Sequence, residues 1–333
     1  MVKIKKSEEK ILDVQEIVKE KITDHNIALK NFLDRVEIED AIVYKNIRLF
    51  AINVKEKFDL KLKTLTEALK ENILEIKETG VVANLQFINK SNDCKIIIME
   101  GEIVKGGRQN RVINVTMILD ENSETIVPTS CVEQGRWSGI SDKFGSDAYV
   151  SPIIYGNLSN SVNKSMMSSR DSGEPMMYCS NQPSLWLSVS CSSASHGSAS
   201  DSSDYTKIYE DREKDIKEYI DKLKPMFKEC AGIAAVIGKK LIFSITDSKE
   251  MFMPQFEKLL KSYILDALVI KEKIKLSIEE VAKHLDCLLE IKSELFDSPN
   301  KIGKIIKFNS DNVIGSAFLY KDSIVHLNII KEL

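Results

Sequence analysis

Two short stretches of the sequence concentrate side chains that are suited to acid–base chemistry and to anion binding. Residues 100–111 and 129–137 together hold Glu100, Glu102, Gly106, Gly107, Arg108, Gln109, Asn110, Arg111, Cys131, Glu133, Gly135, Arg136 and Trp137. Carboxylates can bind ribose hydroxyls, hold a divalent cation or act as general acid and base. Arginines clamp phosphate or carboxylate with two parallel hydrogen bonds, and a tryptophan ring can stack on a base or a sugar.

These residue types suit a nucleotide or nucleotide-sugar ligand. We therefore assign candidate catalytic roles to Glu100, Glu102 and Glu133. We assign ligand contacts to Arg108, Gln109, Asn110, Arg111, Arg136 and Trp137. Gly106 and Gly107 would let backbone N–H groups approach an anion. No cofactor motif is evident, and a divalent cation held by the carboxylates stays an open option.

Cys131 is a candidate nucleophile, because neighbouring arginines favour a thiolate. The competing interpretation is packing, since no histidine lies near Cys131 in the sequence and a cysteine on a strand is commonly buried. The four histidines show no metal-ligand spacing, and His326 is expected to pack on the last strand. We expect Cys131 to serve packing.

A predicted β-hairpin brings the two stretches together. Residues 111–119 and 125–132 read as strands joined by the polar loop 120–123, Asp-Glu-Asn-Ser. If Leu119 faces Glu124, then Asn110 faces Glu133, and a one-residue shift would still leave the two ends adjacent. The strand at 95–99 leads Glu100 to the same place. An alternative is that the arginines and glutamates only bind one another and hold the hairpin ends together.

The remaining elements occur in mixed order without regular β-α-β alternation. Apolar spacing predicts a helix over 7–37, strands over 42–54, 73–78, 81–89 and 95–99, and helices over 211–230, 252–264 and 276–296. Two further hairpins are predicted at 233–245 and 313–330, turning at Gly238-Lys239 and Lys321-Asp322. The class is therefore α+β, with an antiparallel sheet or sandwich core, flanking helices and an N-terminal helical extension.

Composition shifts divide the chain into four segments. Residues 1–41 are a helical extension, residues 42–156 a β-rich half that holds the motifs, and residues 205–333 an α+β half. Between them, residues 157–204 contain 17 serines in 48 residues and are predicted to form a loop or insert. Gln182–Trp186 within it is expected to be anchored. The amphipathic residues 7–37 are a candidate homo-oligomer contact.

Charge and apolar content exclude several classes of protein. The formal net charge of −3 gives no basic surplus for nucleic-acid binding, and no run of 18 apolar residues predicts a membrane span. The N-terminus has charge but no apolar segment of a secretory signal. We therefore expect a cytoplasmic protein whose six cysteines are free thiols.

The same motifs resemble a known family. Its most specific block is PTSCVEQGRW at 128–137, and further matches are YKNIRLF at 44–50, LTEAL at 65–69, EGE at 100–102, GRQNR at 107–111, GIAAV at 232–236 and VHL at 325–327. Over residues 42–331 the chain resembles the ARPP family, domains associated with ADP-ribosylglycohydrolases and with the rhodanese-phosphatase superfamily. The added N-terminal helix and the Ser-rich segment depart from the family pattern.

The resemblance implies a setting in ADP-ribose or NAD-derived nucleotide metabolism, in a bacterial-type stress or conflict system, and implies no particular reaction. The leading hypothesis is a protein that binds, and hydrolyses or modifies, an ADP-ribose-like nucleotide at the motif residues. One alternative is a non-catalytic nucleotide sensor or sequestering module. Another is an interaction protein that oligomerises through its N-terminal helix.

Overall fold

Strands make up most of the interior of the molecule. A computed structural model of the chain describes residues 24–56, 60–136 and 143–333. Those residues form 17 strands in three sheets, together with helices α2 to α9. The pairing is antiparallel, except that β3 and β6 are parallel. The fold is therefore α+β, as the mixed order of elements predicted.

The largest sheet combines strands from both ends of the described chain. Its eight strands lie in the order β1 (Val36–Tyr44), β2 (Ile47–Val54), β12 (Gly232–Ile237), β13 (Lys240–Thr246), β17 (Ser323–Glu332), β16 (Val313–Tyr320), β15 (Lys304–Ser310) and β14 (Ser293–Asp297). The two later hairpins predicted from the sequence are confirmed, because Ile237 pairs with Lys240 and Tyr320 pairs with Ser323. One sheet thus draws on segments 36–54 and 232–332.

Two smaller sheets position the motif residues. The six-stranded sheet has the order β11 (Gly145–Tyr149), β7 (Glu102–Lys105), β8 (Arg111–Ile113), β10 (Ser123–Cys131), β5 (Asn84–Asn89) and β4 (Leu74–Glu78). The three-stranded sheet has the order β3 (Leu62–Thr64), β6 (Lys95–Ile98) and β9 (Met117–Leu119). Glu100 lies where the chain leaves β6 for β7, and Glu102 is the first residue of β7, where it pairs with Tyr149 of β11.

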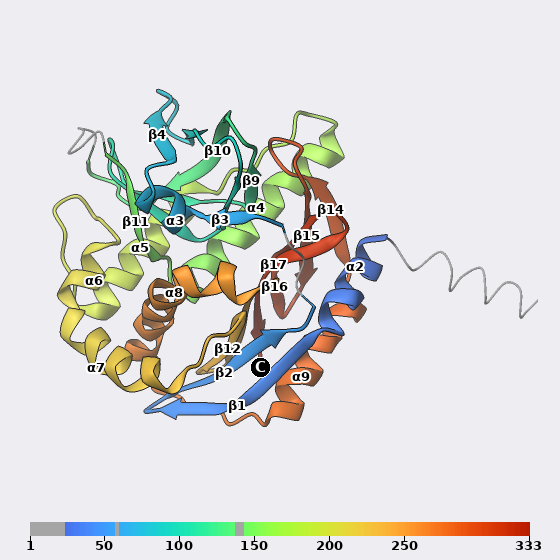
Figure 1. Cartoon of the computed structure of the whole chain (residues 1–333). Helices are drawn as coiled ribbons and strands as arrows, with labels where there is room; N and C mark the ends of the chain where they lie inside the picture. The colour runs from blue at the N-terminus through green and yellow to red at the C-terminus, as the bar shows by residue number, and fades with distance from the viewer. Residues whose placement is uncertain (1–23, 57–59, 137–142) are drawn as a thin grey trace, which may run out of the picture.

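Helix α8 (Lys249–Val269) fills the space between the large sheet and the smaller ones (Figure 1). It contacts β12 and β13 on one side and β3, β11 and α3 (Leu65–Lys70) on the other. On its outer side α8 contacts α7 (Glu213–Leu223), and α7 in turn contacts α6 (Lys207–Asp211) and the 3-10 turn η1 (Lys224–Met226). Most residues of α8 from Met251 to Ala267 are buried, including the polar Gln255, Lys258 and Asp266, which suits an element that is covered on several sides.

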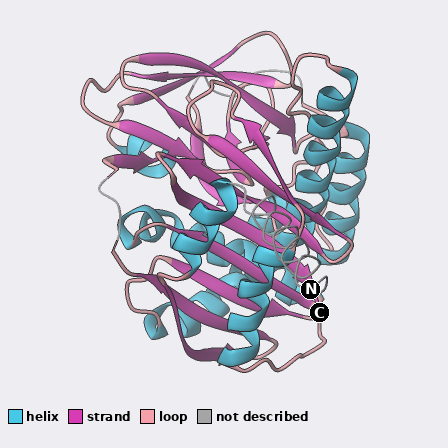
Figure 2. Cartoon of the chain, turned by 90° about the vertical axis from the view of Figure 1, so that its right-hand side faces the viewer, coloured by secondary structure: helices cyan, strands magenta, loops and turns pink. Residues whose placement is uncertain are grey.

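A second apolar core lies on the opposite face of the eight-stranded sheet. Helices α2 (Asp24–Leu33) and α9 (Ile278–Asp286) cover that face, and they lie toward the viewer in Figure 2. Leu29 and Phe32 of α2 and Val281 and Leu285 of α9 are buried in this core. Strands such as β12, buried at every residue, are therefore covered on both faces.

The Ser-rich segment is helical, so the prediction of a loop at 157–204 was wrong. Helix α4 (Pro152–Ser172) ends at Gly173, and α5 (Gln182–His196) ends at Gly197, both glycines in the left-handed conformation. Buried residues of α4 recur at helical spacing, at Tyr155, Leu158, Val162 and Met166. The many serines make this apolar spacing hard to recognise in the sequence, because small hydroxyl side chains are compatible with packed helices as well as with loops.

The boundaries of two predicted helices were also wrong. The described part of the predicted helix 7–37 is α2, which ends at Leu33, and residues 7–23 lie outside the described residues. The chain enters strand β1 at Val36 because it pairs there with β2. The predicted helix 276–296 ends with α9 and the 3-10 turn η2 (Cys287–Glu290), and residues 293–297 pair with β15. In both cases the end of the predicted helix is a strand instead, because those residues pair with β2 or with β15.

The predicted first hairpin exists only at its open end. β10 pairs with β8 through Cys131 opposite Arg111 and Thr129 opposite Ile113, one residue away from the predicted register. The first part of β10 pairs with β5 instead, and β9 pairs with β6 in the other small sheet. The chain crosses between the two sheets after Ile113, so the second half of the predicted strand has a different partner.

Candidate functional site

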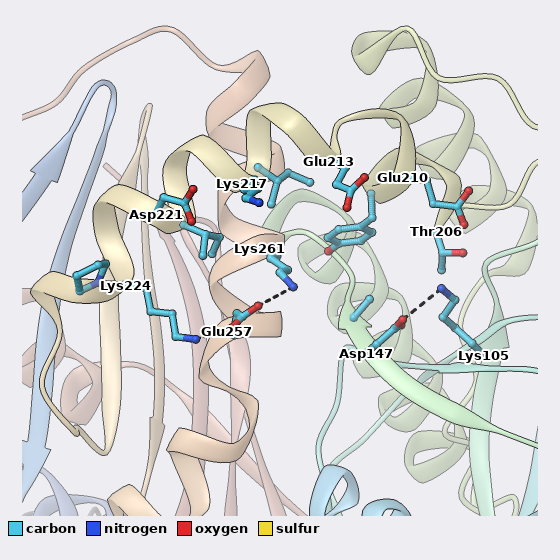
Figure 3. A pocket seen from close by; sticks show the side chains of 15 residues that line it. Lys105, Asp147, Thr206, Glu210, Glu213, Lys217, Asp221, Lys224, Glu257 and Lys261 are labelled. Atoms are coloured by element: carbon cyan, nitrogen blue, oxygen red, sulfur yellow. Dashed lines mark hydrogen bonds and ion pairs between the residues drawn. The ribbon is translucent and has the colours of Figure 1, made fainter.

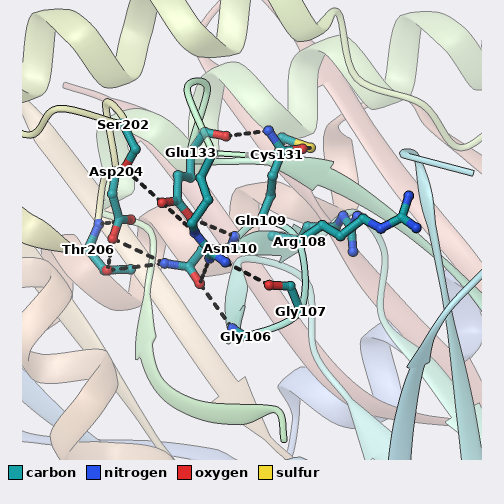
Figure 4. A network of polar contacts seen from close by, with 12 residues as sticks. Gly106, Gly107, Arg108, Gln109, Asn110, Cys131, Glu133, Ser202, Asp204 and Thr206 are labelled. Carbon is teal, nitrogen blue, oxygen red and sulfur yellow. Dashed lines mark hydrogen bonds and ion pairs between the residues drawn. The ribbon is translucent and has the colours of Figure 1, made fainter. Parts of the chain in front are cut away.

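The predicted convergence of the two motif stretches is confirmed, and its centre is the carboxylate of Glu133 (Figure 4). Arg136 donates from Nε to Oε1 at 2.8 Å and from Nη2 to Oε2 at 2.6 Å. The backbone N–H of Asn110 donates to Oε2 at 3.0 Å, and Ser202 Oγ donates to Oε1 at 2.8 Å. Both carboxylate oxygens are therefore already occupied by protein donors.

Burial and hydrogen bonding act on Glu133 in opposite directions. Burial alone would raise the pKa of this carboxyl, because it disfavours the charged form. The hydrogen bonds from Arg136, Ser202 and Asn110 outweigh burial and hold the pKa of Glu133 below its usual value. A carboxylate held ionised inside such a network is poorly suited to serve as a general acid.

The strand end at Glu133 pairs with the last residues of the Ser-rich segment. Gly135 N donates to Ser202 O at 2.8 Å, Tyr205 N donates to Val132 O at 2.9 Å, and Glu133 forms a β-bridge with Asp204. A Cβ atom at Gly135 would lie 2.9 Å from Ser202 Cα, so this close approach requires glycine. The pairing fixes 200–206 beside the motif.

Asp204 extends the network toward Thr206. Asn110 Nδ2 donates to Asp204 Oδ2 at 3.1 Å, and Thr206 Oγ1 donates to the same oxygen at 2.8 Å. We refer to Asn110, Glu133, Arg136, Ser202, Asp204 and Thr206 as the signature network. Sequence reasoning missed the last three of these. The sequence signal available was the Ser-Asp-Ser-Ser-Asp run itself, which lies in the segment predicted to form a loop or insert.

Gly106 and Gly107 serve close packing rather than an open anion-binding loop. Both adopt positive φ, +125° and +59°. A Cβ atom at Gly107 would lie 2.4 Å from Glu78 Oε1 and 2.5 Å from Phe144 Cζ. Gly106 N already donates to Asn110 Oδ1 at 3.0 Å, and Gly107 O accepts from Arg136 Nη1 at 2.6 Å. These groups hold the signature network together.

The three predicted ligand-binding arginines have different environments. Arg111 is 2% exposed and binds Glu78 with two hydrogen bonds of 3.1 and 2.9 Å. Arg136 donates hydrogen bonds to the carboxylate of Glu133 and to the backbone oxygen of Gly107. Arg108 has an exposed side chain, and its backbone N–H donates to Glu78 at 2.8 Å. Trp137 lies outside the described residues.

Glu100 lies apart from the signature network, between the sheets. Its carboxylate accepts from Tyr155 Oη at 2.8 Å and from Ser316 Oγ, and Lys307 Nζ lies 3.2 Å away. Next to it, Thr116 Oγ1 is 2.9 Å from His326 Nδ1. Burial lowers the pKa of His326 to about 4, so its ring is neutral at neutral pH.

Glu102 is likewise paired away from Glu133. It contacts Lys258 Nζ and accepts from Ser146 Oγ at 2.9 Å. Lys258 in turn donates to Thr66 Oγ1 at 2.7 Å. The side chains of Glu102 and Lys258 are only 2% and 7% exposed, so both charges are buried and mutually compensated. The three glutamates thus occupy three separate, internally satisfied positions.

Cys131 is completely buried. Its thiol donates to Gln109 Oε1 at 3.0 Å, and Gln109 Nε2 donates to Glu133 O at 2.8 Å. Burial raises the pKa of Cys131 despite the nearby guanidinium of Arg111. Gln182 of α5 bonds both backbone groups of Cys131, at 2.9 and 2.8 Å, so that segment is anchored as predicted. This environment favours packing over nucleophilic chemistry.

A groove lies next to the signature network. A groove of about 710 Å³ runs from Thr206 and Lys105 along α6, α7 and α8 (Figure 3). Its apolar lining includes Ala148, Tyr209 and Ile216, and lysines and carboxylates surround it. Lys105 directly precedes Gly106, and Thr206 belongs to the network itself, so the motif residues form one end wall of this groove.

A family comparison agrees with the motif analysis. Residues 35–330 match the model of the ARPP-1 family, described as the ARG and Rhodanese-Phosphatase-superfamily-associated Protein domain. The chain belongs to the ARPP-1 family. No curated protein and no solved structure matched significantly. The family description places the ARPP-1 domain alongside ADP-ribosylglycohydrolases and rhodanese-phosphatase-type proteins without specifying a reaction.

Two further observations concern the described part of this ARPP-1 domain. Within residues 24–56, 60–136 and 143–333, no helix is long and apolar enough to cross a membrane. In the same residues, no three His, Cys, Asp or Glu side chains are arranged to hold a metal ion. The groove residues on α7 and α8 were not identified as site candidates from the sequence, since lysines and glutamates at helical spacing are typical of any solvated helix face.

Proposed function

We propose that this ARPP-1 domain binds an ADP-ribose-like or NAD-derived nucleotide in the groove beside the signature network. The observation that carries the proposal is the position of the groove, whose end wall contains Thr206 and Lys105 of the motif region. Its volume of about 710 Å³ lies in the range of small-molecule sites. The family's association with ADP-ribosylglycohydrolases supports a nucleotide of this class.

The groove lining offers partners for each part of such a ligand. Lys217 is exposed and, among the described residues, forms no ion pair, so it is available for a phosphate. The carboxylates of Glu210 and Glu213 can accept hydrogen bonds from ribose hydroxyls. The ring of Tyr209 is half-buried in the lining and offers a surface for stacking.

The environments of the candidate catalytic residues support binding rather than turnover. Glu100, Glu102 and Glu133 are each buried and compensated by a cation, and Cys131 has a raised pKa. We therefore favour a sensor or sequestering role over hydrolysis at those residues. In this proposal the network shapes the end of the groove, and the ligand contacts come from α6, α7 and α8.

Calorimetry with ADP-ribose, NAD, AMP and ribose 5-phosphate tests the proposal. Lys217→Ala is expected to weaken binding of the preferred nucleotide about tenfold, the scale of one charge-assisted hydrogen bond. Lys249→Ala is the matched control, because Lys249 is an exposed lysine outside the groove that pairs with Glu229. Binding by the control should equal that of the parent.

Two results would contradict the proposal. The first is the absence of binding by the parent for every nucleotide in the panel. The second is nucleotide binding that Lys217→Ala and Lys249→Ala leave equally unchanged. Chromatography of the incubated nucleotides separates the sensor from an enzyme, because a product peak that requires the folded protein would show turnover.

A further inference from the structure

Three lysines approach one end of the groove from different elements. Lys217 comes from α7, Lys224 from η1 and Lys261 from α8, and all three line the groove (Figure 3). The opposite end is dominated by carboxylates, namely Asp147, Glu210 and Glu213 around Lys105. The charged residues of the lining are therefore unevenly distributed, with an excess of cations at one end of the groove and of carboxylates at the other.

Glu257 occupies the cationic end. Its Oε2 lies 2.7 Å from Lys224 Nζ, and its Oε1 lies 2.8 Å from Lys261 Nζ. Each carboxylate oxygen thus binds a separate lysine, one on α8 itself and one across the groove on η1. The side chains of all three residues are partly exposed, at 42%, 52% and 36% for Glu257, Lys224 and Lys261.

The charges at this end leave a positive excess. Lys217, Lys224 and Lys261 face Glu257 and Asp221, so three cations oppose two carboxylates. Hydrogen bonds from Lys224 and Lys261 lower the pKa of Glu257 to about 2, which keeps this internal anion charged throughout the neutral range. An incoming phosphate would need the same two ammonium groups that now bind Glu257.

We infer that the lysine end of the groove is an anion subsite for a phosphate group, and that Glu257 occupies it as an internal competitor when no ligand is bound. This inference rests on and deepens the proposed function, since it assigns the phosphates of the nucleotide to Lys217, Lys224 and Lys261. Binding exchanges the Glu257 contacts for contacts with the ligand, because a carboxylate and a phosphate oxygen use the same donors. Glu257 therefore lowers the affinity of the subsite for phosphate.

Pyrophosphate is the direct probe, because it carries the phosphates without the nucleoside. Glu257→Gln keeps the side-chain shape and removes the competing charge. It is expected to tighten pyrophosphate binding about tenfold by calorimetry, the scale of two solvent-exposed ion pairs released from competition. Glu229→Gln is the control, because Glu229 pairs with Lys249 outside the groove, and it should leave affinity unchanged.

Glu257→Asp provides a second variant, in which the carboxylate is retained but withdrawn by one methylene. An intermediate gain in affinity is expected. Pyrophosphate affinity that stays unchanged or falls in both Glu257 variants would overturn the inference, since Glu257 would then orient the lysines instead of competing. The same holds if pyrophosphate binds neither the parent nor the variants.

These results separate the two proposals. If Glu257→Gln tightens pyrophosphate binding while no nucleotide binds the parent, the anion subsite stands and the nucleotide proposal fails. If ADP-ribose binds and Lys217→Ala weakens it, but Glu257→Gln tightens neither ligand, the nucleotide proposal stands and the competitor role fails.

Discussion

At the scale of single residues, charge compensation decides which candidate groups remain available for chemistry. The sequence predicted a catalytic role for Glu133 and a ligand contact for Arg136, yet each uses the other as its principal partner. Removing one charge from a buried pair leaves the other uncompensated, which is strongly destabilising. The motif side chains are therefore required for the local structure whether or not a ligand binds nearby.

Asp266 on α8 carries a testable pH dependence. Its carboxylate is 3% exposed and accepts from Ile153 N of α4 at 2.9 Å. Burial raises its pKa from 3.8 to about 6, although hydrogen bonds to the carboxylate oppose the shift. Between those two values the folded state binds more protons than the unfolded state, so the contribution of Asp266 to stability falls as pH rises.

We expect the free energy of unfolding, measured with urea from pH 4 to pH 7, to decline more steeply in the parent than in Asp266→Asn. The amide cannot ionise and keeps an oxygen that can accept from Ile153 N. Parallel pH profiles for the two proteins would show that Asp266 titrates as it does in the unfolded chain.

At the scale of elements, the turn between β7 and β8 depends on the side chains packed against it. Gly107 combines a positive φ with two close neighbours, Glu78 and Phe144. Glu78 binds Arg111 and Arg108 N, so displacing its carboxylate would disturb both contacts. A side chain at Gly107 would therefore affect both the conformation of the turn and the contacts that Glu78 makes with Arg111 and Arg108.

Gly107→Ala is expected to lower the free energy of unfolding by about 1–3 kcal/mol more than Gly197→Ala, because overpacking adds to backbone strain. Gly197 is the matched control, since its φ of +62° is close to the +59° of Gly107 and no atom would lie within 4 Å of its Cβ. Chemical denaturation of both variants measures the difference. Equal losses of unfolding free energy in the two variants would mean that backbone strain alone, without overpacking, accounts for the need for glycine at Gly107.

At the scale of the whole molecule, Glu100 and Lys307 connect the small sheets to the large one. Glu100 follows β6, Lys307 lies in β15, and Ser316 of β16 and Tyr155 of α4 also bind the Glu100 carboxylate. Both charged side chains are 1% exposed. Because either charge would be left buried and uncompensated without the other, we expect this cluster to favour the observed packing of the small sheets against the large one.

Lys307→Met is expected to cost about 3–5 kcal/mol of unfolding free energy, because Glu100 would remain buried without its cation. Adding Glu100→Gln should recover part of that loss. Lys249→Met is the control, an exposed pair whose removal should cost at most about 1 kcal/mol. Thermal and urea unfolding of the four proteins provide the comparison, and a Lys307→Met variant as stable as Lys249→Met would contradict it.

Local sequence patterns are enough to predict the class of the fold, the two later hairpins and the convergence of Asn110 with Glu133. Each follows from local patterns, namely apolar alternation, turn residues and short-range pairing. Tertiary contacts decided the rest. Strand β10 changes partner from β5 to β8 midway, and the Ser-rich residues 157–204 form helices because distant surfaces cover their apolar positions.

The same division applies to the site. Residue types alone indicated that the motif carries charge, but not whether that charge faces a ligand or another side chain. Ser202 contacts Glu133, Lys258 contacts Glu102 and Lys307 contacts Glu100 only in the folded chain. The two members of each pair are separated by between 69 and 207 residues in the sequence. Such pairing depends on packing between layers, which no local sequence pattern encodes, and it leaves the open space in the neighbouring groove rather than at the motif.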